Sequence, residues 1–390
     1  MLLDGTKAAA PGAGQRALLD SAVAAALEDC APSSVRWNYE NGLILSALWA
    51  CGENEGSGIN HGGEELLSAV KERIDALIDS GGSISGYRKD EFNIDQVNAG
   101  KVVLSLWKRY GEERYRKTVL ALLSQMAEHP RTASGSFWHK KIYPHQVWLD
   151  GLYMACPFLA RCAREFTAPA LLDDVCAQLL RARDTMRDSA TGLYYHARDE
   201  SRAMAWANPA TGLSPHIWGR AVGWLAMALA DTLPFVPETH PDKQDVLAMF
   251  VRLMGTVEKA QDSSGLWHQV LDQPEREGNY LETSASAMFA YALLKGLRLG
   301  YLDASPSFGF QRAAAKALAS LATERVRYDE AGRFHLLGIC KVAGLGGNPY
   351  RDGSFSYYVN EAVGADDFKG TGPFILALNE SLAHHILFIY

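Results

Sequence analysis

The sequence predicts an all-α protein in which about six helical hairpins close into a toroid, with an inner ring of helices inside an outer ring. Apolar residues recur at three- and four-residue spacing in about twelve segments of this 390-residue chain, and no β-rich block interrupts them. A short motif also recurs one hairpin apart. Because a lone hairpin cannot bury its apolar face, neighbouring hairpins must stack. An open solenoid is the alternative, but neither end of the chain offers an evident polar capping repeat.

The apolar periodicity predicts each helix in turn. The expected segments are 15–29, 38–51, 64–80, 96–109, 114–127, 147–164, 170–187, 217–233, 243–260, 281–299, 310–326 and 371–388. Short aromatic stretches at 192–197 and 332–338 are candidates for small strands only. We therefore expect one catalytic domain over residues 15–390, preceded by a separate N-terminal segment, residues 1–14.

The recurring motif begins with Gly and one variable residue and ends with aromatic residues followed by His. Its histidines are His139, His196, His268 and His335. They could converge at one end of a toroid, but none has i, i+4 pairing or an HExxH context, so we predict no metal. No cofactor motif is present either, because the glycine-rich segment 342–354 lacks the phosphate-binding pattern.

The composition of the chain limits which classes of molecule it can bind. The net charge of −7 argues against a nucleic acid or an anionic membrane, and no apolar run approaches the length of a membrane span. The first residues lack an apolar core like that of a secretory signal, which predicts a cytoplasmic protein. The six cysteines have neither CxxC spacing nor disulfide-scaffold density, so we expect buried thiols. A small ligand is the expected partner.

Asp150 is the leading candidate for chemistry. It lies inside the aromatic and aliphatic stretch 137–161, where a carboxyl group would be poorly solvated. Desolvation raises a carboxyl pKa, as a general acid near neutrality requires. The competing interpretation is that Asp150 merely caps the following helix, a common use of aspartate.

Two further segments support a sugar-binding pocket. Asp95 precedes another helix, where it too could be a cap, and Arg220 lies between Trp218 and Trp224 at a helix start. A guanidinium group pairs with a carboxylate, and the tryptophans offer flat apolar faces. The alternative is a surface arginine packed on core aromatics.

The segments FWHKKIYPHQVWLDGLYM, IWGRAVGW, AGLGGNPYRDGSFSYY and DFKGTGPFILALNE together resemble the unsaturated rhamnogalacturonyl hydrolases, family 105 of the glycoside hydrolases. The related unsaturated glucuronyl hydrolases of family 88 are similar. The resemblance runs from about residue 38 to the last helix. It implies an (α/α)6 barrel and hydration of the C4=C5 enol ether in the terminal sugar of a lyase product, a small oligosaccharide. The unsaturated uronic acid is then released, and the implied substrate is unsaturated galacturonyl-rhamnose.

The resemblance also implies roles for particular residues. Asp150 would protonate C4 and then activate the water that attacks C5, while Asp95 would supply a like charge that keeps Asp150 protonated. Arg220 would bind the uronate carboxylate. The remaining implied pocket residues are Tyr39, His139, Lys140, Trp148, His196, Trp218 and Trp224.

Three other functions stay open from the sequence. A family-88-like preference for glycosaminoglycan or other polyuronide fragments is the nearest alternative. An epimerase-isomerase on the same toroid would use paired histidines. The segments around Asp150 and Arg220 argue against this function. A non-catalytic sugar-binding protein would need no acid in an apolar setting.

Overall fold

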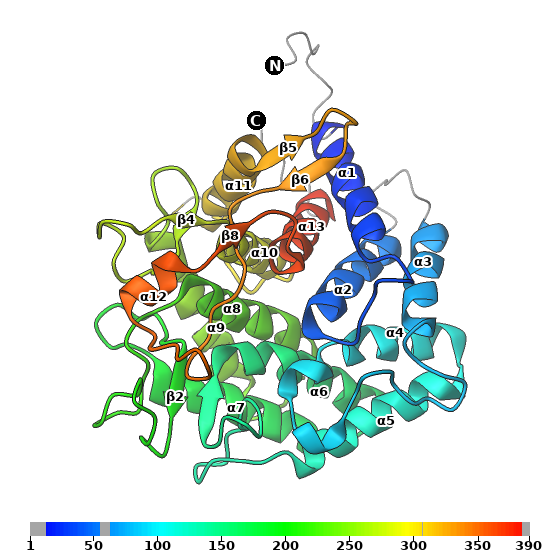
Figure 1. The fold of residues 1–390 in the computed structure, drawn as a ribbon, viewed down its shortest axis with the longest axis horizontal. Helices are drawn as coiled ribbons and strands as arrows, with labels where there is room; N and C mark the ends of the chain where they lie inside the picture. Colours follow the sequence, from blue (N-terminus) through cyan, green and yellow to red (C-terminus); the bar gives the residue numbers. More distant parts are fainter. Residues whose placement is uncertain (1–12, 55–62, 306, 384–390) are drawn as a thin grey trace.

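The computed structural model describes residues 13–54, 63–305 and 307–383 (Figure 1). Its α-helices are α1 Ala13–Asp29, α2 Tyr39–Glu53, α3 Gly63–Asp75, α4 Gly100–Tyr110, α5 Glu113–Glu128, α6 Leu149–Glu165, α7 Ala170–Met186, α8 Gly219–Thr232, α9 Lys243–Lys259, α10 Thr283–Arg298, α11 Phe310–Ser320, α12 Phe355–Asn360 and α13 Phe368–Ala383. The prediction of a mainly helical chain is confirmed. The expected segment 1–14 lies outside the described residues, except for residues 13 and 14 at the start of α1.

Six helices pack against one another in a closed succession: α2 on α4, α4 on α6, α6 on α8, α8 on α10, α10 on α13, and α13 back on α2. Each also packs against one further helix, namely α3, α5, α7, α9, α11 and α1 respectively. Figure 1 shows the six arranged around the middle of the molecule, with α3 and α5 outside them. We call α2, α4, α6, α8, α10 and α13 the inner helices.

Burial distinguishes the inner helices from their partners. α8, α10 and α13 are buried at nearly every position, as helices surrounded by others are. α5, in contrast, buries only the apolar stripe that faces its neighbour. The sequence reflects this difference, because Ala, Gly and Leu dominate the inner helices and charged residues the outer faces.

The strands are short and form two-stranded antiparallel sheets. They are β1 Gln146–Trp148 with β2 Ala197–Asp199, β3 Trp267–His268 with β4 Leu281–Glu282, β5 Val326–Tyr328 with β6 Phe334–Leu336, and β7 Ile339–Cys340 with β8 Val363–Gly364. Several lie at the repeated motif. Its four glycines all have positive φ, and in each turn the glycine N–H donates to a carbonyl three or four residues earlier. The repeat is therefore a shared turn geometry that only glycine adopts without strain.

Two predicted helices differ from the structure, and one observed helix was not predicted. The helix expected over 64–80 ends at Asp75, because Asp79 organises a turn by accepting from the N–H groups of Gly81 and Ser83. The segment expected to begin at 96 starts with a 3-10 turn, Ile94–Val97, before α4. α12 was not predicted, since its six residues are too few to show a period.

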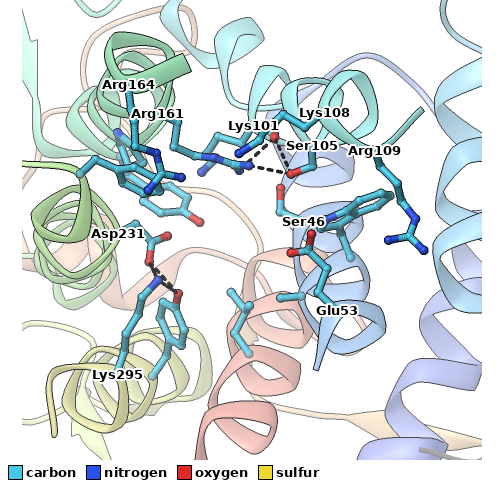
Figure 2. A pocket seen from close by; sticks show the side chains of 17 residues that line it. Ser46, Glu53, Lys101, Ser105, Lys108, Arg109, Arg161, Arg164, Asp231 and Lys295 are labelled. Carbon is cyan, nitrogen blue, oxygen red and sulfur yellow. Dashed lines mark hydrogen bonds and ion pairs between the residues drawn. The ribbon is translucent and has the colours of Figure 1, made fainter. Parts of the chain in front are cut away.

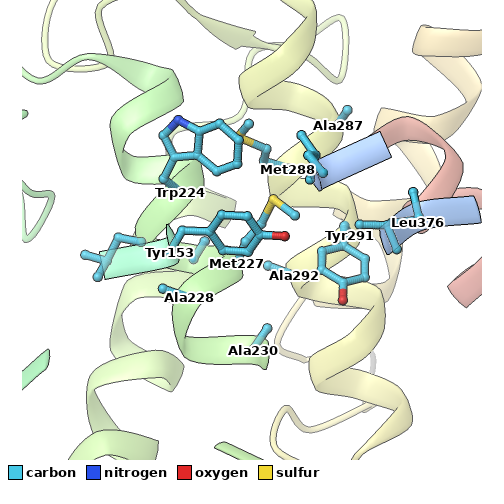
Figure 3. Packing of buried hydrophobic residues seen from close by; sticks show 14 of the residues in the cluster. Tyr153, Trp224, Met227, Ala228, Ala230, Ala287, Met288, Tyr291, Ala292 and Leu376 are labelled. Atoms are coloured by element: carbon cyan, nitrogen blue, oxygen red, sulfur yellow. The ribbon is translucent and has the colours of Figure 1, made fainter. Parts of the chain in front are cut away.

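Large side chains fill the centre of the ring (Figure 3). Tyr153 of α6 stacks on Trp224 of α8 with 4.9 Å between ring centroids, and Met227 and Met288 are completely buried beside them. We call Tyr153, Trp224, Met227 and Met288 the central partition. The inner helices begin on one side of the partition and end on the other.

Two further sequence expectations concern cysteines and membranes. All six cysteines are buried and unpaired, as predicted. Among the described helices, none has the length and apolar character needed to cross a bilayer.

Candidate active site

Asp150 and His196 meet at the end of the ring where the inner helices begin. Asp150 is the second residue of α6, and β1 immediately before it pairs with β2, so that Trp148 lies opposite Ala197. The Leu149 N–H donates to the His196 carbonyl at 3.1 Å. These backbone bonds bring His196 Nε2 to 3.3 Å from Asp150 Oδ2, while His196 Nδ1 lies 2.8 Å from the Tyr358 hydroxyl.

The pKa of Asp150 differs from the sequence expectation. Burial is the largest single effect and raises it, as predicted, but the contact with His196, the nearby His139 and a backbone hydrogen bond together hold the pKa below its usual value. Asp150 is also not the helix cap, because the N-cap of α6 is Trp148. The side chain keeps 15% of its exposure, so it remains open to a ligand.

Asp95 lies in a second charged group beside Asp150. Its Oδ2 is 2.6 Å from Lys140 Nζ, and its Oδ1 is 3.7 Å from His139 Nε2. Burial lowers the pKa of His139 to about 4, so His139 is neutral near pH 7 and Lys140 is the cation that pairs with Asp95. This pairing corrects one expectation: Asp95 is neutralised locally and is a poor source of like charge for Asp150.

Backbone contacts also place His139. The Ile94 N–H donates to the His139 carbonyl, which ties the segment carrying Asp95 to the segment carrying His139. A methyl group at Gly151 would lie only 3.2 Å from His139 Nδ1. The glycine that follows Asp150 therefore leaves the room that the imidazole occupies.

Aromatic rings form a continuous wall around the Asp150–His196 pair. Trp148 stacks on His139 with 4.5 Å between centroids and meets His196 edge-on at 5.2 Å. On the other side of His196, Trp218 lies 4.8 Å away and stacks in turn on Tyr358. Trp148 and Trp218, predicted to wall the pocket, thus both contact His196, the histidine that faces Asp150.

Arg220 is buried beneath this wall. Its guanidinium group lies 4.7 Å from the Trp218 ring, and its Nη1 donates to Ser284 Oγ at 3.2 Å and to the Cys340 carbonyl. The described residues offer no hydrogen-bond partner to its Nε and Nη2. These two nitrogens therefore remain available to an anion that reaches them, although Glu282 and Asp367 already offset part of the charge.

Tyr39 lies beside the central partition, where it contacts Trp224. Tyr39 opens α2 and meets Trp224 edge-on at 6.3 Å. Trp224 is 1% exposed and contacts Tyr153 on its other side. Tyr39 therefore stands between Trp224 and the mouth of the site.

Several residues near the site were not predicted. Tyr358 binds His196, and Glu282 caps α10 while accepting from the Cys340 N–H beside Arg220. Leu345 and Trp206 pack on Trp148 in a small apolar cluster of their own. Tyr358 and Leu345 both lie in the segment AGLGGNPYRDGSFSYY, whose dense glycines and aromatics were the available signal.

One group of potential metal ligands lies within the described residues: Cys176, His240 and Asp242, whose donor atoms are within 4.8 Å of one another. Both ring nitrogens of His240 are already engaged, Nε2 with Asp173 and Nδ1 with the Asp242 N–H. This group is therefore a hydrogen-bonded turn.

Comparisons with known proteins agree with one another. Residues 19–384 match the model of Glycosyl Hydrolase Family 88. A glycoside hydrolase from family 105 of C. acetobutylicum ATCC 824 is 41% identical, with a TM-score of 0.86 over 94% of this chain and 98% of that one.

Two other proteins extend the comparison. The unsaturated rhamnogalacturonyl hydrolase YesR of Bacillus subtilis is 32% identical over 247 residues, which cover 60% of this chain and 65% of that protein. The unsaturated glucuronyl hydrolase of Bacillus sp. GL1 shares the fold, with a TM-score of 0.65 and 17% identity over 93% of this chain and 95% of that one.

Proposed function

Because this chain belongs to the related glycoside hydrolase families 88 and 105, we propose that it releases an unsaturated uronic acid from the non-reducing end of lyase-generated oligosaccharides. The chain is accordingly a hydrolase. We also infer that the closed succession of inner helices, each with one outer partner, is an (α/α)6 barrel. The observation that carries the function is the Asp150 carboxyl at the mouth of this ring, partly exposed and held against a single histidine.

The favoured substrate is unsaturated galacturonyl-rhamnose. Support comes from the 32% identity to an unsaturated rhamnogalacturonyl hydrolase. The chemistry of the pocket agrees, since an arginine beneath a tryptophan suits a carboxylate on a flat sugar ring.

In the proposed reaction one carboxyl group acts twice. Protonated Asp150 delivers its proton to C4, and positive charge develops at C5 and the ring oxygen. The resulting carboxylate then takes a proton from the water that attacks C5. The hemiketal collapses, and the remainder of the oligosaccharide leaves. Asp95 is not needed as a nucleophile, in keeping with its pairing to Lys140, so the usual two-carboxylate scheme does not apply.

The low pKa of Asp150 means that substrate must help to protonate it. The uronate carboxylate adds a negative charge near Asp150, which raises the pKa of that group. His196, 3.3 Å away, is the neighbour placed to pass it a proton. Arg220 would hold the uronate, Trp148 and Trp218 would flank the sugar, and Tyr39, backed by Trp224, would close the inner end. His139, together with the Lys140–Asp95 pair, would line the remaining side.

The test follows the C4=C5 double bond, whose near-ultraviolet absorbance disappears on hydration. We expect wild-type protein to bleach unsaturated galacturonyl-rhamnose and Asp150→Asn to be inactive with an unchanged melting temperature. Asp262→Asn, which alters a turn carboxylate of the repeated motif, is the matched control and should stay active. An active Asp150→Asn variant would overturn the mechanism.

The second candidate is a family-88-like activity on glycosaminoglycan fragments. The observation that favours this candidate is the fold shared with the Bacillus sp. GL1 enzyme. Comparing kcat/KM for the two unsaturated disaccharides decides between them. Epimerase chemistry loses its support, because the chain belongs to hydrolase families.

A further inference from the structure

A basic cavity of about 510 Å³ lies at the opposite end of the ring from Asp150 (Figure 2). All six inner helices contribute to its lining. The cationic residues of the lining are Lys101, Lys108, Arg109, Arg161, Arg164 and Lys295, whereas the anionic ones are Glu53 and Asp231. Cations therefore outnumber anions three to one in a protein whose net charge is −7.

Helix ends explain only part of this excess. Lys108, Arg109, Arg164 and Lys295 belong to the last turns of their helices, where cations offset the negative end of the helix dipole. Most of them also have carboxylate partners, such as Glu165 for Lys108 and Asp231 for Lys295. Lys101 is in the first turn of α4 and Arg161 lies one turn before the end of α6, so the dipole accounts for neither.

Lys101 is a buried amine without a partner. It is 4% exposed, and its Nζ lies 3.6 Å from the centre of the Tyr153 ring. No described residue hydrogen-bonds to this nitrogen. Burial, together with the charges of Arg161 and Lys295, lowers the pKa of Lys101 to about 7, and Asp231 opposes this shift. Such a group destabilises the fold unless a ligand satisfies it.

Arg161 is held by neutral acceptors, and only the more distant carboxylates Glu53 and Asp231 offset its charge. Its Nη1 donates to the Lys101 carbonyl at 3.0 Å and its Nη2 to Ser105 Oγ at 2.6 Å, both of which are neutral acceptors (Figure 2). No carboxylate of the described residues forms an ion pair with Arg161. Two basic side chains from adjacent inner helices thus face the same space, and neither forms an ion pair with a described residue.

The cavity also has apolar faces. Trp49, Phe235 and Tyr291 line it, and the described residues give the Trp49 indole N–H no acceptor. Tyr153 of the central partition forms its inner boundary and separates it from Trp224 and Tyr39 on the other side. The cavity is therefore distinct from the site around Asp150.

We propose that this cavity binds a compact organic anion, a molecule of monosaccharide size that carries a carboxylate or phosphate group. The anion would accept hydrogen bonds from Lys101 and Arg161, and its body would lie against the aromatic side chains. A volume of about 510 Å³ is within the range of small-ligand sites. This inference does not depend on the hydrolytic function.

Calorimetric titration of the whole chain tests the proposal with three anionic probes: inorganic phosphate, glucose 6-phosphate and galacturonate. Glucose is the neutral control. We expect at least one anionic probe to bind, and Lys101→Met and Arg161→Gln each to weaken that binding about tenfold or more, as losing a charged hydrogen bond does. Lys140→Met, a lysine substitution at the catalytic end, should leave that binding unchanged.

A second readout keeps the test decisive if a variant is unstable. Lys101→Met removes an unpartnered buried amine, so its melting temperature should equal or exceed that of wild type, and bleaching of the disaccharide should persist. Absence of binding by all three anions, or equal binding by wild type and both cavity variants, would overturn the proposal. So would binding that Lys140→Met abolishes, since this would place the anion at the catalytic end.

Discussion

Asp150 has few close ionisable neighbours, so its protonation depends strongly on one of them. The described residues give its carboxyl one close ionisable contact, His196, and that histidine is fixed in turn by Tyr358. The sequence correctly indicated a buried aspartate among aromatics. The family resemblance placed His196 in the pocket, but the sequence could not reveal its contact with Asp150, because residues 150 and 196 meet only through the pairing of β1 with β2.

We predict that His196→Gln moves the pH profile of kcat/KM. Without the imidazole, burial loses its main opposing contact, so the pKa of Asp150 rises in the free enzyme. Because the proposed reaction starts from protonated Asp150, the alkaline limb should move up by about one pH unit or more. Tyr358→Phe keeps the imidazole and should cause a smaller shift. A limb that stays in place or moves down would contradict this account.

At the scale of helices, close approach between inner helices depends on small residues. Gly223 of α8 faces α10, and a methyl group there would lie 2.7 Å from Met288 Sδ and 2.9 Å from Met288 Cβ. α8 and α10 form one of the largest helix contacts in the ring. The glycine therefore sets how near the two helices come.

Gly223→Ala should consequently lower the free energy of unfolding by about 1–3 kcal/mol, the usual cost of overpacking a core. The matched control is Gly255→Ala in α9, where a methyl group meets nothing within 4 Å. That change should stabilise the protein by up to about 1 kcal/mol through helix propensity. Urea denaturation of both variants measures the difference, and equal effects would contradict the packing argument.

Asp231 connects the same two helices electrostatically. Its Oδ1 is 2.6 Å from Lys295 Nζ and accepts from the Tyr291 hydroxyl at 2.6 Å. Burial raises the pKa of Asp231, but these contacts and the charge of Lys101 lower it below its usual value. Its stabilising contribution is therefore complete above about pH 4, near the unfolded pKa, and is lost as the pH falls through the lower folded value.

Asp231→Asn should destabilise the protein by about 1–3 kcal/mol at pH 7, because it leaves the partly buried Lys295 without its counter-charge. The variant should also lose less stability than wild type between pH 4 and pH 2. Asp245→Asn, at an exposed ion pair with Arg183, is the control and should cost at most about 1 kcal/mol. Parallel pH dependences for wild type and Asp231→Asn would refute the assignment.

At the scale of the whole molecule, the period of apolar residues was sufficient to find twelve helices, because each buries a face against a neighbour. The sequence did not predict details that depend on a few side chains. Examples are the early end of α3 and the six-residue helix α12. The sequence did not predict which charged groups of the site pair with one another, for the same reason. Lys140 follows His139 in sequence, but only the fold shows that it neutralises Asp95.

Closure predicts cooperative unfolding. Each inner helix packs between two others, so removing one exposes apolar surface on both neighbours. We expect residues 15–390 to unfold in a single calorimetric transition whose van't Hoff and calorimetric enthalpies agree. Two separable transitions would contradict the single-domain prediction.

The central partition has a consequence for how a polysaccharide can approach. Side chains of Tyr153, Trp224, Met227 and Met288 block the axis of the ring, so no open channel runs from one end to the other (Figure 3). A polymer cannot thread through the molecule and slide forward after each cut. Substrate and products must therefore enter and leave at the same end of the ring.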